Sequence, residues 1–106
     1  MSAKLFYEKT IKEIDNIEQP AQRWMRARGW IFEKVVSLSR NGWPDRCAIK
    51  YGLVIWVELK APKKTPKQHQ LDIHAAIRAN GGTVVWFDNL DAFKAYFRTI
   101  DEQNAF

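Results

Sequence analysis

Residues 45–60, DRCAIKYGLVIWVELK, decide the fold. The stretch consists of two runs, DRCAIK at residues 45–50 and LVIWVELK at residues 53–60, separated by the pair Tyr51-Gly52. Runs of this length with apolar and β-branched residues at their centre are typical of strands, and a two-residue separation is typical of a β-hairpin. We therefore predict that the two runs form neighbouring antiparallel strands.

The pairing of these strands brings charged side chains together. If Tyr51-Gly52 is a two-residue turn, Asp45 lies directly opposite Glu58, with Cβ atoms about 5 Å apart. Because side chains alternate along a strand, Lys60 shares the face of Glu58. Opposed carboxylates repel unless something neutralises them, so the register predicts a site for a divalent cation. A type I′ turn requires positive φ at Tyr51, whereas a three-residue loop would turn Asp45 to the other face.

These residue types suit phosphodiester hydrolysis. Two carboxylates favour Mg²⁺ or Mn²⁺, which keep several waters and accept phosphate oxygens. Such an ion polarises a phosphate and activates a bound water, while Lys60 orients that water or offsets charge in the transition state. The backbone carbonyl of Leu59 is a further candidate ligand. Taken singly, Asp45 after a proline also suits a turn, and Glu58 with Lys60 also suits an exposed strand edge.

The segments after the hairpin predict a crossover. Residues 61–67 form a basic, proline-containing connection, and residues 67–80 have helical spacing and end at Gly81-Gly82. Residues 83–87 read as a buried strand, and Asp88 or Asn89 can cap a final helix. A strand-helix-strand unit predicts a right-handed crossover between parallel strands.

The segment before the hairpin predicts a helix and a strand. A helix is expected from about residue 16 to residue 28, closed by Gly29, with a capping box from Asp15 and Glu18 and Pro20 in its first turn. A shorter helical piece is expected before it, and one kinked helix is the alternative. The first strand is expected over residues 30–38, followed by a loop.

The first strand is expected to place four side chains on one face, namely Trp30, Phe32, Lys34 and Val36. The loop that follows is expected over residues 39–44. The whole order is helix, three strands, helix, strand, helix. We therefore predict an α/β fold, a mixed β-sheet flanked by helices.

Composition limits the chain to a small basic domain. With 106 residues and 46% hydrophobic residues, it has room for one core, so we expect a single domain over residues 1–106 with its core at about 16–100. The lone Cys47 allows no internal disulfide, and no apolar run could span a bilayer. We expect a cytoplasmic protein without membrane contact. The formal charge of +5 favours a polyanionic partner such as nucleic acid.

The spacing of these residues resembles a known family. Gly42-Trp43-Pro44-Asp45, then Glu58-Leu59-Lys60 thirteen positions on, then Gln70 with His74, is similar to the VRR-NUC branch of the PD-(D/E)xK nucleases. The resemblance covers roughly residues 17–90. It implies a restriction-endonuclease-like fold with Asp45 and Glu58 as metal ligands and Lys60 as the active-site lysine.

The resemblance also implies further site residues and a substrate class. Gln70 would be an additional site residue, chosen over Gln68 because of the four-residue step to His74, and Glu18 would be a second-shell acid or a ligand of a second metal. His74 is left out of the predicted metal site, because a histidine four residues after Gln70 more often packs or forms hydrogen bonds than binds a metal. Short stand-alone members are similar to virus-encoded homodimers that act on branched DNA such as four-way junctions, which would place the protein in the host cytoplasm.

Basic and aromatic side chains near the predicted site are candidate DNA contacts. A track along the phosphate backbone would bind by charge rather than by base sequence. Lys34 could instead extend its stem over apolar neighbours, and the lysines after the hairpin could simply be solvated. The candidates are Lys34, Arg40, Trp43, Arg46, Lys63, Lys64 and Lys67.

The leading hypothesis is therefore a Mg²⁺- or Mn²⁺-dependent DNA endonuclease. Two alternatives stay open: a catalytically silent DNA-binding module with the same basic surface, and a nuclease that works only as a subunit of a larger assembly. Cleavage assays with divalent metals distinguish the silent binding module from a nuclease. Light scattering with and without DNA distinguishes a homodimer from a subunit of a larger assembly.

Overall fold

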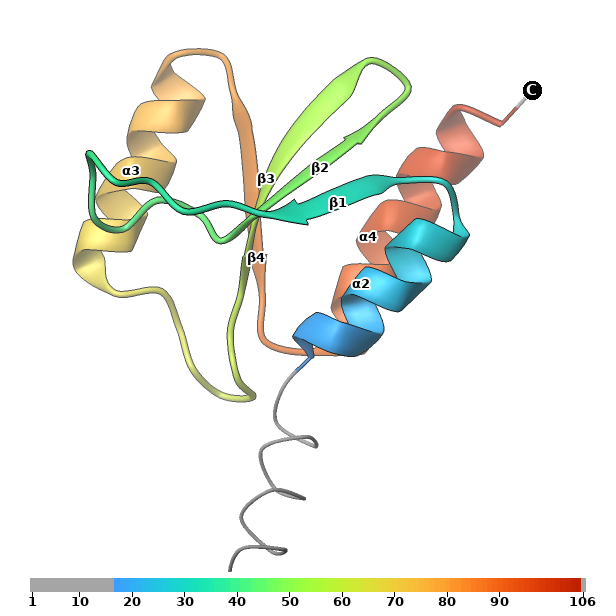
Figure 1. The fold of residues 1–106 in the computed structure, drawn as a ribbon, viewed down its shortest axis with the longest axis horizontal. Helices are drawn as coiled ribbons and strands as arrows, with labels where there is room; N and C mark the ends of the chain where they lie inside the picture. The colour runs from blue at the N-terminus through green and yellow to red at the C-terminus, as the bar shows by residue number, and fades with distance from the viewer. Residues whose placement is uncertain (1–16, 106) are drawn as a thin grey trace, which may run out of the picture.

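A computed structural model describes residues 17–105. It contains three helices and four strands in the predicted order (Figure 1). The elements are α2 (Glu18–Ala27), β1 (Ile31–Lys34), β2 (Arg46–Lys50), β3 (Leu53–Leu59), α3 (Gln68–Ala79), β4 (Thr83–Phe87) and α4 (Leu90–Gln103).

The four strands form one mixed sheet in the order β1-β2-β3-β4. The pairs β1-β2 and β2-β3 are antiparallel, whereas β3 and β4 are parallel and are joined through α3. The predicted crossover is thus confirmed, and with it the α/β class. Since β3 has neighbours on both sides, the end of this strand is held more firmly than an edge strand would be.

Helices cover both faces of the sheet, as Figure 1 shows: α2 and α4 lie together on one side and α3 on the other. The larger core lies under α2 and α4, where Phe32, Phe93 and Phe97 are fully buried. The smaller core lies under α3 and includes Ile73 and Ile77. Because successive side chains of β3 point to opposite faces, Val57 enters the larger core, while Glu58 faces α3.

The hairpin has the predicted register. Lys50 pairs with Leu53, and Tyr51 and Gly52 both have positive φ, at 57° and 76°. This is the backbone pattern of a type I′ turn, whose twist matches that of the flanking strands. The uncommon conformation of Tyr51 is supported by its hydroxyl, which donates a hydrogen bond of 2.6 Å to the Asp101 carboxylate.

The first strand is shorter than predicted. β1 ends at Lys34 instead of residue 38, and Val36 is 72% exposed rather than sharing a buried face with Phe32. The last ladder bond runs from the amide of Val35 to the carbonyl of Asp45. The next position on the partner strand is Pro44, which has no amide to donate, so pairing stops there. The connection therefore spans residues 35–45 instead of 39–44.

The ends of the helices refine the other expectations. α2 begins at Glu18, with Ile17 as N-cap and no side-chain capping bond, and it ends before Gly29, whose φ is +85°. The predicted cap at Asp15 and the earlier helical piece lie outside the described residues. Of the two candidate caps for α4, Asn89 is used: its side chain accepts a hydrogen bond of 2.8 Å from the Ala92 amide. No helix within residues 17–105 is both long and apolar enough to cross a bilayer.

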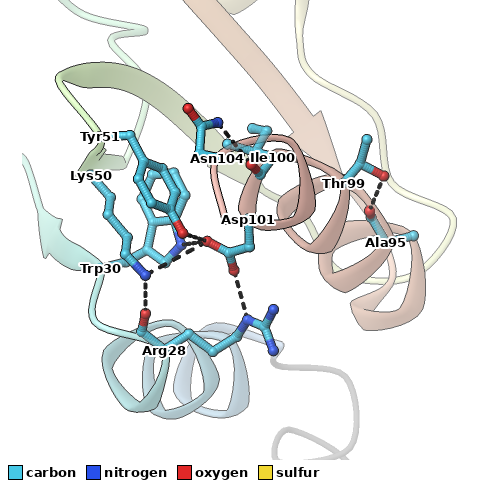
Figure 2. A network of polar contacts seen from close by, with 9 residues as sticks. All are labelled: Arg28, Trp30, Lys50, Tyr51, Ala95, Thr99, Ile100, Asp101 and Asn104. Carbon is cyan, nitrogen blue, oxygen red and sulfur yellow. Dashed lines mark hydrogen bonds and ion pairs between the residues drawn. The ribbon is translucent and has the colours of Figure 1, made fainter. Parts of the chain in front are cut away.

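A buried polar cluster fastens the C-terminal helix to the hairpin turn (Figure 2). Asp101 of α4 is only 8% exposed and accepts hydrogen bonds from Arg28 at 2.8 Å, Trp30 at 3.1 Å and Tyr51. The Lys50 ammonium lies 3.7 Å from the same carboxylate. One side chain therefore joins three segments that are far apart in the sequence.

Candidate active site

The side chain of Glu58 is a buried carboxylate at the end of a central strand. It has no exposed surface, and neither oxygen accepts a hydrogen bond from the described residues. An ionised carboxylate in such a place costs several kcal/mol unless a cation or a proton compensates it. The position is thus stable only with a partner for the negative charge.

The carboxyl of Asp45 lies against Glu58. The register of β2 with β3, continued one residue beyond the pair Arg46 and Val57, places the two acids opposite each other. Burial above all, together with the direct contact with the Asp45 carboxyl and its charge, raises the pKa of Glu58 to about 8, while Lys60 opposes the shift. The carboxylates meet as the hairpin predicts.

This shifted pKa makes a prediction for the metal-free protein. Folded Glu58 keeps its proton up to a pKa of about 8, whereas the ordinary value is 4.5, so the folded state binds more protons across that window. Stability therefore falls as the pH rises from about 4.5 to 8. Glu58→Gln cannot ionise, and we expect it to exceed the wild type in stability by about 1–3 kcal/mol at pH 9 in EDTA, with a smaller gain at pH 5.

Urea unfolding at pH 5, 7 and 9 in EDTA measures this gain. Glu33→Gln, at an exposed acid on β1, is the matched control and should leave the pH dependence unchanged. A gain from Glu58→Gln that is the same at all three pH values would contradict the buried-charge account.

Lys60 is held by Gln70. The Lys60 ammonium donates a hydrogen bond of 2.8 Å to Oε1 of Gln70, and the same oxygen accepts another of 2.8 Å from the Lys67 amide at the start of α3. The Lys60 amide bonds to the carbonyl of Phe87 on β4, which fixes the backbone just after β3. Gln70 on the following helix thus lies beside the lysine, while its role as a site residue stays a prediction.

His74 contacts Glu58, a contact that the sequence reasoning did not predict. The imidazole is fully buried, its Nε2 lies 3.6 Å from Oε1 of Glu58, and neither ring nitrogen has a hydrogen-bond partner among the described residues. Burial lowers the pKa of His74, and the charges of Arg78 and Lys60 lower it further, which keeps the ring neutral. A signal was available in the sequence, because His74 is four residues after Gln70 and so lies on the same helical face.

Glu18 and Leu59 adjoin the carboxylate pair in different ways. Glu18 opens α2, and its charge adds to the raised pKa of Glu58, which places it near the pair. Leu59 ends β3 with its side chain in the larger core. Within residues 17–105, no three His, Cys, Asp or Glu side chains are grouped closely enough to hold an ion by themselves. The described part of the chain thus brings together two carboxylates, and an ion at this position would need water, backbone or substrate for its other ligands.

The loop before Asp45 is packed tightly against α3. Gly42 has a φ of +89°, and a Cβ there would lie 2.7 Å from Cδ2 of His69 and 3.1 Å from its carbonyl oxygen. Only glycine fits this approach without displacement. A hollow of about 190 Å³ on the loop is lined by Lys34, Arg40 and Trp43 together with Asp45 itself.

The predicted DNA contacts differ in their exposure. Lys63, Lys64 and Lys67 are exposed on the connection between β3 and α3. Arg46, in contrast, is only 4% exposed, donates a hydrogen bond of 2.8 Å to Gln22 of α2 and stacks over Phe32. The prediction of Arg46 as a DNA contact is therefore wrong. Side-chain alternation explains it, because a strand that turns Asp45 toward α3 turns Arg46 toward α2.

A divalent cation fits the residues present. Glu58 offers two buried oxygens without donors, and Asp45 offers a second carboxylate in contact with it. Hard oxygen donors in this number suit Mg²⁺ or Mn²⁺, which retain several waters and need few protein ligands. An ion bound there would remove the repulsion between the two acids.

Comparison with known proteins finds a related phage protein and a solved structure of similar fold. No protein-family model matches the chain. A protein of Acyrthosiphon pisum secondary endosymbiont phage 1, named "Putative nuclease p44", is 41% identical over 78 residues, which are 73% of this chain and 84% of the phage protein. A solved structure titled "VRR_NUC domain" has the same fold, with a TM-score of 0.72 at 24% identity over 77% of this chain and 90% of its own.

The mixed sheet and the phage relative define the class of the protein, a nuclease with a small α/β fold. Within that class, the chain belongs to the same family as this phage nuclease, and its fold is that of the VRR_NUC domain. The predicted resemblance and the predicted order of elements are thereby confirmed.

Proposed function

We propose that the protein is a metal-dependent endonuclease that hydrolyses phosphodiester bonds of DNA. The observation that carries the proposal is the buried, unpartnered carboxylate of Glu58 in contact with Asp45, next to a lysine that Gln70 holds in place. A structural role alone would not leave a carboxylate in this state, because a glutamine or an apolar residue would cost less there. Mg²⁺ or Mn²⁺ is the proposed cofactor.

Each residue has a distinct proposed role. Asp45, Glu58 and the Leu59 carbonyl would hold the ion, which when bound polarises the scissile phosphate and lowers the pKa of a bound water. Lys60 places a positive charge where negative charge grows in the transition state, and Gln70 orients its ammonium. Glu18 adds negative charge near the pair and is the proposed outer or second-ion ligand.

His74 is proposed as a positioning residue for Glu58. A neutral imidazole has one N–H to donate, and its Nε2 faces Oε1 of Glu58 across 3.6 Å. Carboxylates that hold metals are commonly oriented by such neighbours, whose loss weakens metal affinity.

The basic surface supports DNA as the substrate. The exposed lysines Lys63, Lys64 and Lys67 follow directly after Lys60, and Lys34 and Arg40 lie on the other side beside Asp45. A cleavage centre between two groups of cations suits a polyanionic strand that passes across it. These five side chains are proposed to contact phosphates.

Branched DNA, such as a four-way junction, is the proposed substrate, cut by a homodimer in the host cytoplasm. A row of apolar side chains across the sheet supports self-association. Ile31, Ile49 and Val54 are neighbours in the strand register, and Ile31 and Val54 are 54% and 48% exposed. A paired enzyme would present two cleavage centres to the two strands of a symmetric junction.

A cleavage panel tests the proposed function. Junction, flap, nicked and intact duplex DNA would be incubated with purified protein in Mg²⁺, in Mn²⁺ and in EDTA, while light scattering gives the mass with and without DNA. We expect cleavage only with a divalent metal, fastest on branched DNA, and the mass of a dimer. Binding without cleavage under every metal condition would instead indicate a silent DNA-binding module, and activity only after addition of a cell extract would indicate a subunit of an assembly.

A further inference from the structure

A larger hollow adjoins the loop before Asp45. It has a volume of about 390 Å³ and lies between that loop, Trp56 of β3 and the C-terminal end of α3. Neither Asp45 nor Glu58 is among its lining residues. The hollow is therefore a feature separate from the carboxylate pair.

Two tryptophans form its walls. The rings of Trp43 and Trp56 are nearly perpendicular, at 83° with centroids 5.3 Å apart, and both are only partly buried against the core of Ile77. Within residues 17–105, neither indole N–H donates to a protein acceptor. The walls thus offer a flat aromatic face and two free donors.

The rim of the hollow is polar and carries positive charge. Arg40 is exposed at one side, and Asn80 is exposed at the other. The Asn80 amide nitrogen is already used in a 2.8 Å hydrogen bond to the Ala76 carbonyl, so its oxygen stays available as an acceptor. Among the described lining residues none is acidic, which makes the hollow unsuited to a cation.

A planar heteroaromatic ring with donors and acceptors on its edge fits this combination. Nucleobases stack on aromatic side chains and hydrogen-bond through their edges, while a guanidinium close by binds the phosphate that accompanies them. An aliphatic chain would leave the indole and amide groups without partners. The chemistry of the walls and the rim therefore favours a nucleobase.

The hollow shares part of its lining with the smaller hollow beside Asp45. Arg40 and Trp43 line both this hollow and the smaller one beside Asp45, which Lys34 also lines. A DNA strand with one phosphate at the carboxylates can place the next against these cations. The following base then lies at the tryptophans.

We propose that this hollow binds one nucleobase of the strand that is cut, a base that is unpaired from its complement. This inference rests on the proposed cleavage of DNA and specifies its substrate class: DNA with an unpaired nucleotide close to the scissile bond. A base inside an intact duplex is stacked and cannot reach such a pocket without being extruded, which costs a few kcal/mol. Single-stranded flaps supply unpaired bases without that cost, whereas a fully paired junction would have to open a base pair.

A binding cycle in EDTA tests the proposal without cleavage. Fluorescence anisotropy gives the affinity of the full chain for a series of flap DNAs. In each DNA, one unpaired nucleotide is replaced by an abasic residue, and the position of that residue moves stepwise away from the branch point. At one position, loss of the base should weaken binding by wild-type protein roughly tenfold, a typical value for one base stacked on an aromatic ring. Trp43→Leu should weaken binding of the intact flap by a similar factor and leave that of the abasic flap unchanged.

Matched variants keep the test decisive. Trp24→Leu makes the same change on α2, across the sheet, and should affect both DNAs equally or not at all. Asn80→Ala alters an exposed side chain, so the fold is retained, and it should weaken binding of the intact flap alone. Equal weakening of both DNAs by Trp43→Leu, or no sensitive position in the scan, would overturn the base pocket. If the binding measurements give the expected result but the protein cleaves no DNA in the metal panel, the nuclease proposal is overturned while the base pocket stands.

Discussion

Asp45→Asn is expected to abolish DNA cleavage while DNA binding is kept. The substitution preserves the size of the side chain but removes one of the two charges that would hold the cation next to Glu58. A bound metal contributes several kcal/mol to stabilisation of the transition state, and each 1.36 kcal/mol is a factor of ten in rate. We therefore expect the rate of cleavage to fall by at least about a thousandfold.

Binding should respond differently because Asp45 repels phosphate. Affinity for junction DNA, measured by anisotropy in EDTA, should stay equal or rise slightly in the variant. Single-turnover cleavage in Mg²⁺ gives the rate, and Asp72→Asn on an exposed turn of α3 serves as a matched acid-to-amide control. Undiminished cleavage by Asp45→Asn would show that the carboxylate pair is not the reaction centre.

The carboxylate pair was predictable because a hairpin turns local sequence into long-range geometry. A two-residue turn at Tyr51-Gly52 leaves a single register, and strand alternation then determines which side chains share a face. The same alternation, applied to Arg46, would have shown that this side chain enters the core under α2. That residue was misassigned because its charge was weighed without its place on the strand.

The length of β1 was not predictable from its own residues. Val36 and Leu38 are as apolar as a strand requires, yet both are largely exposed, at 72% and 97%. The limit is set by the partner strand, since Pro44 offers no amide for the next ladder bond. A propensity argument reads one strand at a time and does not include this constraint.

For the site residues on α3, the sequence predicted their place on the helix but not the groups that they contact. Helical spacing places Gln70 and His74 on one face, but which groups they meet depends on how α3 packs over β3 and β4. The contact between His74 and Glu58 and the hollow at Trp56 follow from that packing. Both required the arrangement in space.

Asp101→Asn is expected to cause the largest loss of stability. The carboxylate accepts hydrogen bonds from Arg28, Trp30 and Tyr51, and Lys50 lies close by (Figure 2). Hydrogen bonds to charged groups contribute about 1.5–3 kcal/mol each and do not add fully, so an amide of the same shape should lower the free energy of unfolding by about 2–4 kcal/mol. For a domain of this size, that corresponds to a Tm lower by at least about 8 °C.

The effect should depend on pH in the sense opposite to that of Glu58. Burial alone would raise the pKa of Asp101, but the hydrogen bonds from Tyr51, Arg28 and Trp30 and the charge of Lys50 together hold it below its usual value. A lowered pKa contributes stability that is present above the ordinary value of about 3.8 and is lost as the pH falls through the folded-state pKa. The difference in the free energy of unfolding between wild type and Asp101→Asn should therefore be largest at neutral pH and disappear in strong acid.

Urea unfolding at pH 7 and at pH 3 measures the gap, with Glu102→Gln, the exposed neighbour on α4, as a control expected to change stability by less than about 0.5 kcal/mol. A gap that persists unchanged in acid would mean that the shape of the side chain, and not its charge, matters. The prediction also bears on the site, because Asp101 holds the hydroxyl of Tyr51 and Tyr51 sets the hairpin register. A loosened turn should lower the cleavage rate even where the variant is still folded, since Asp45 and Glu58 face each other in one register alone.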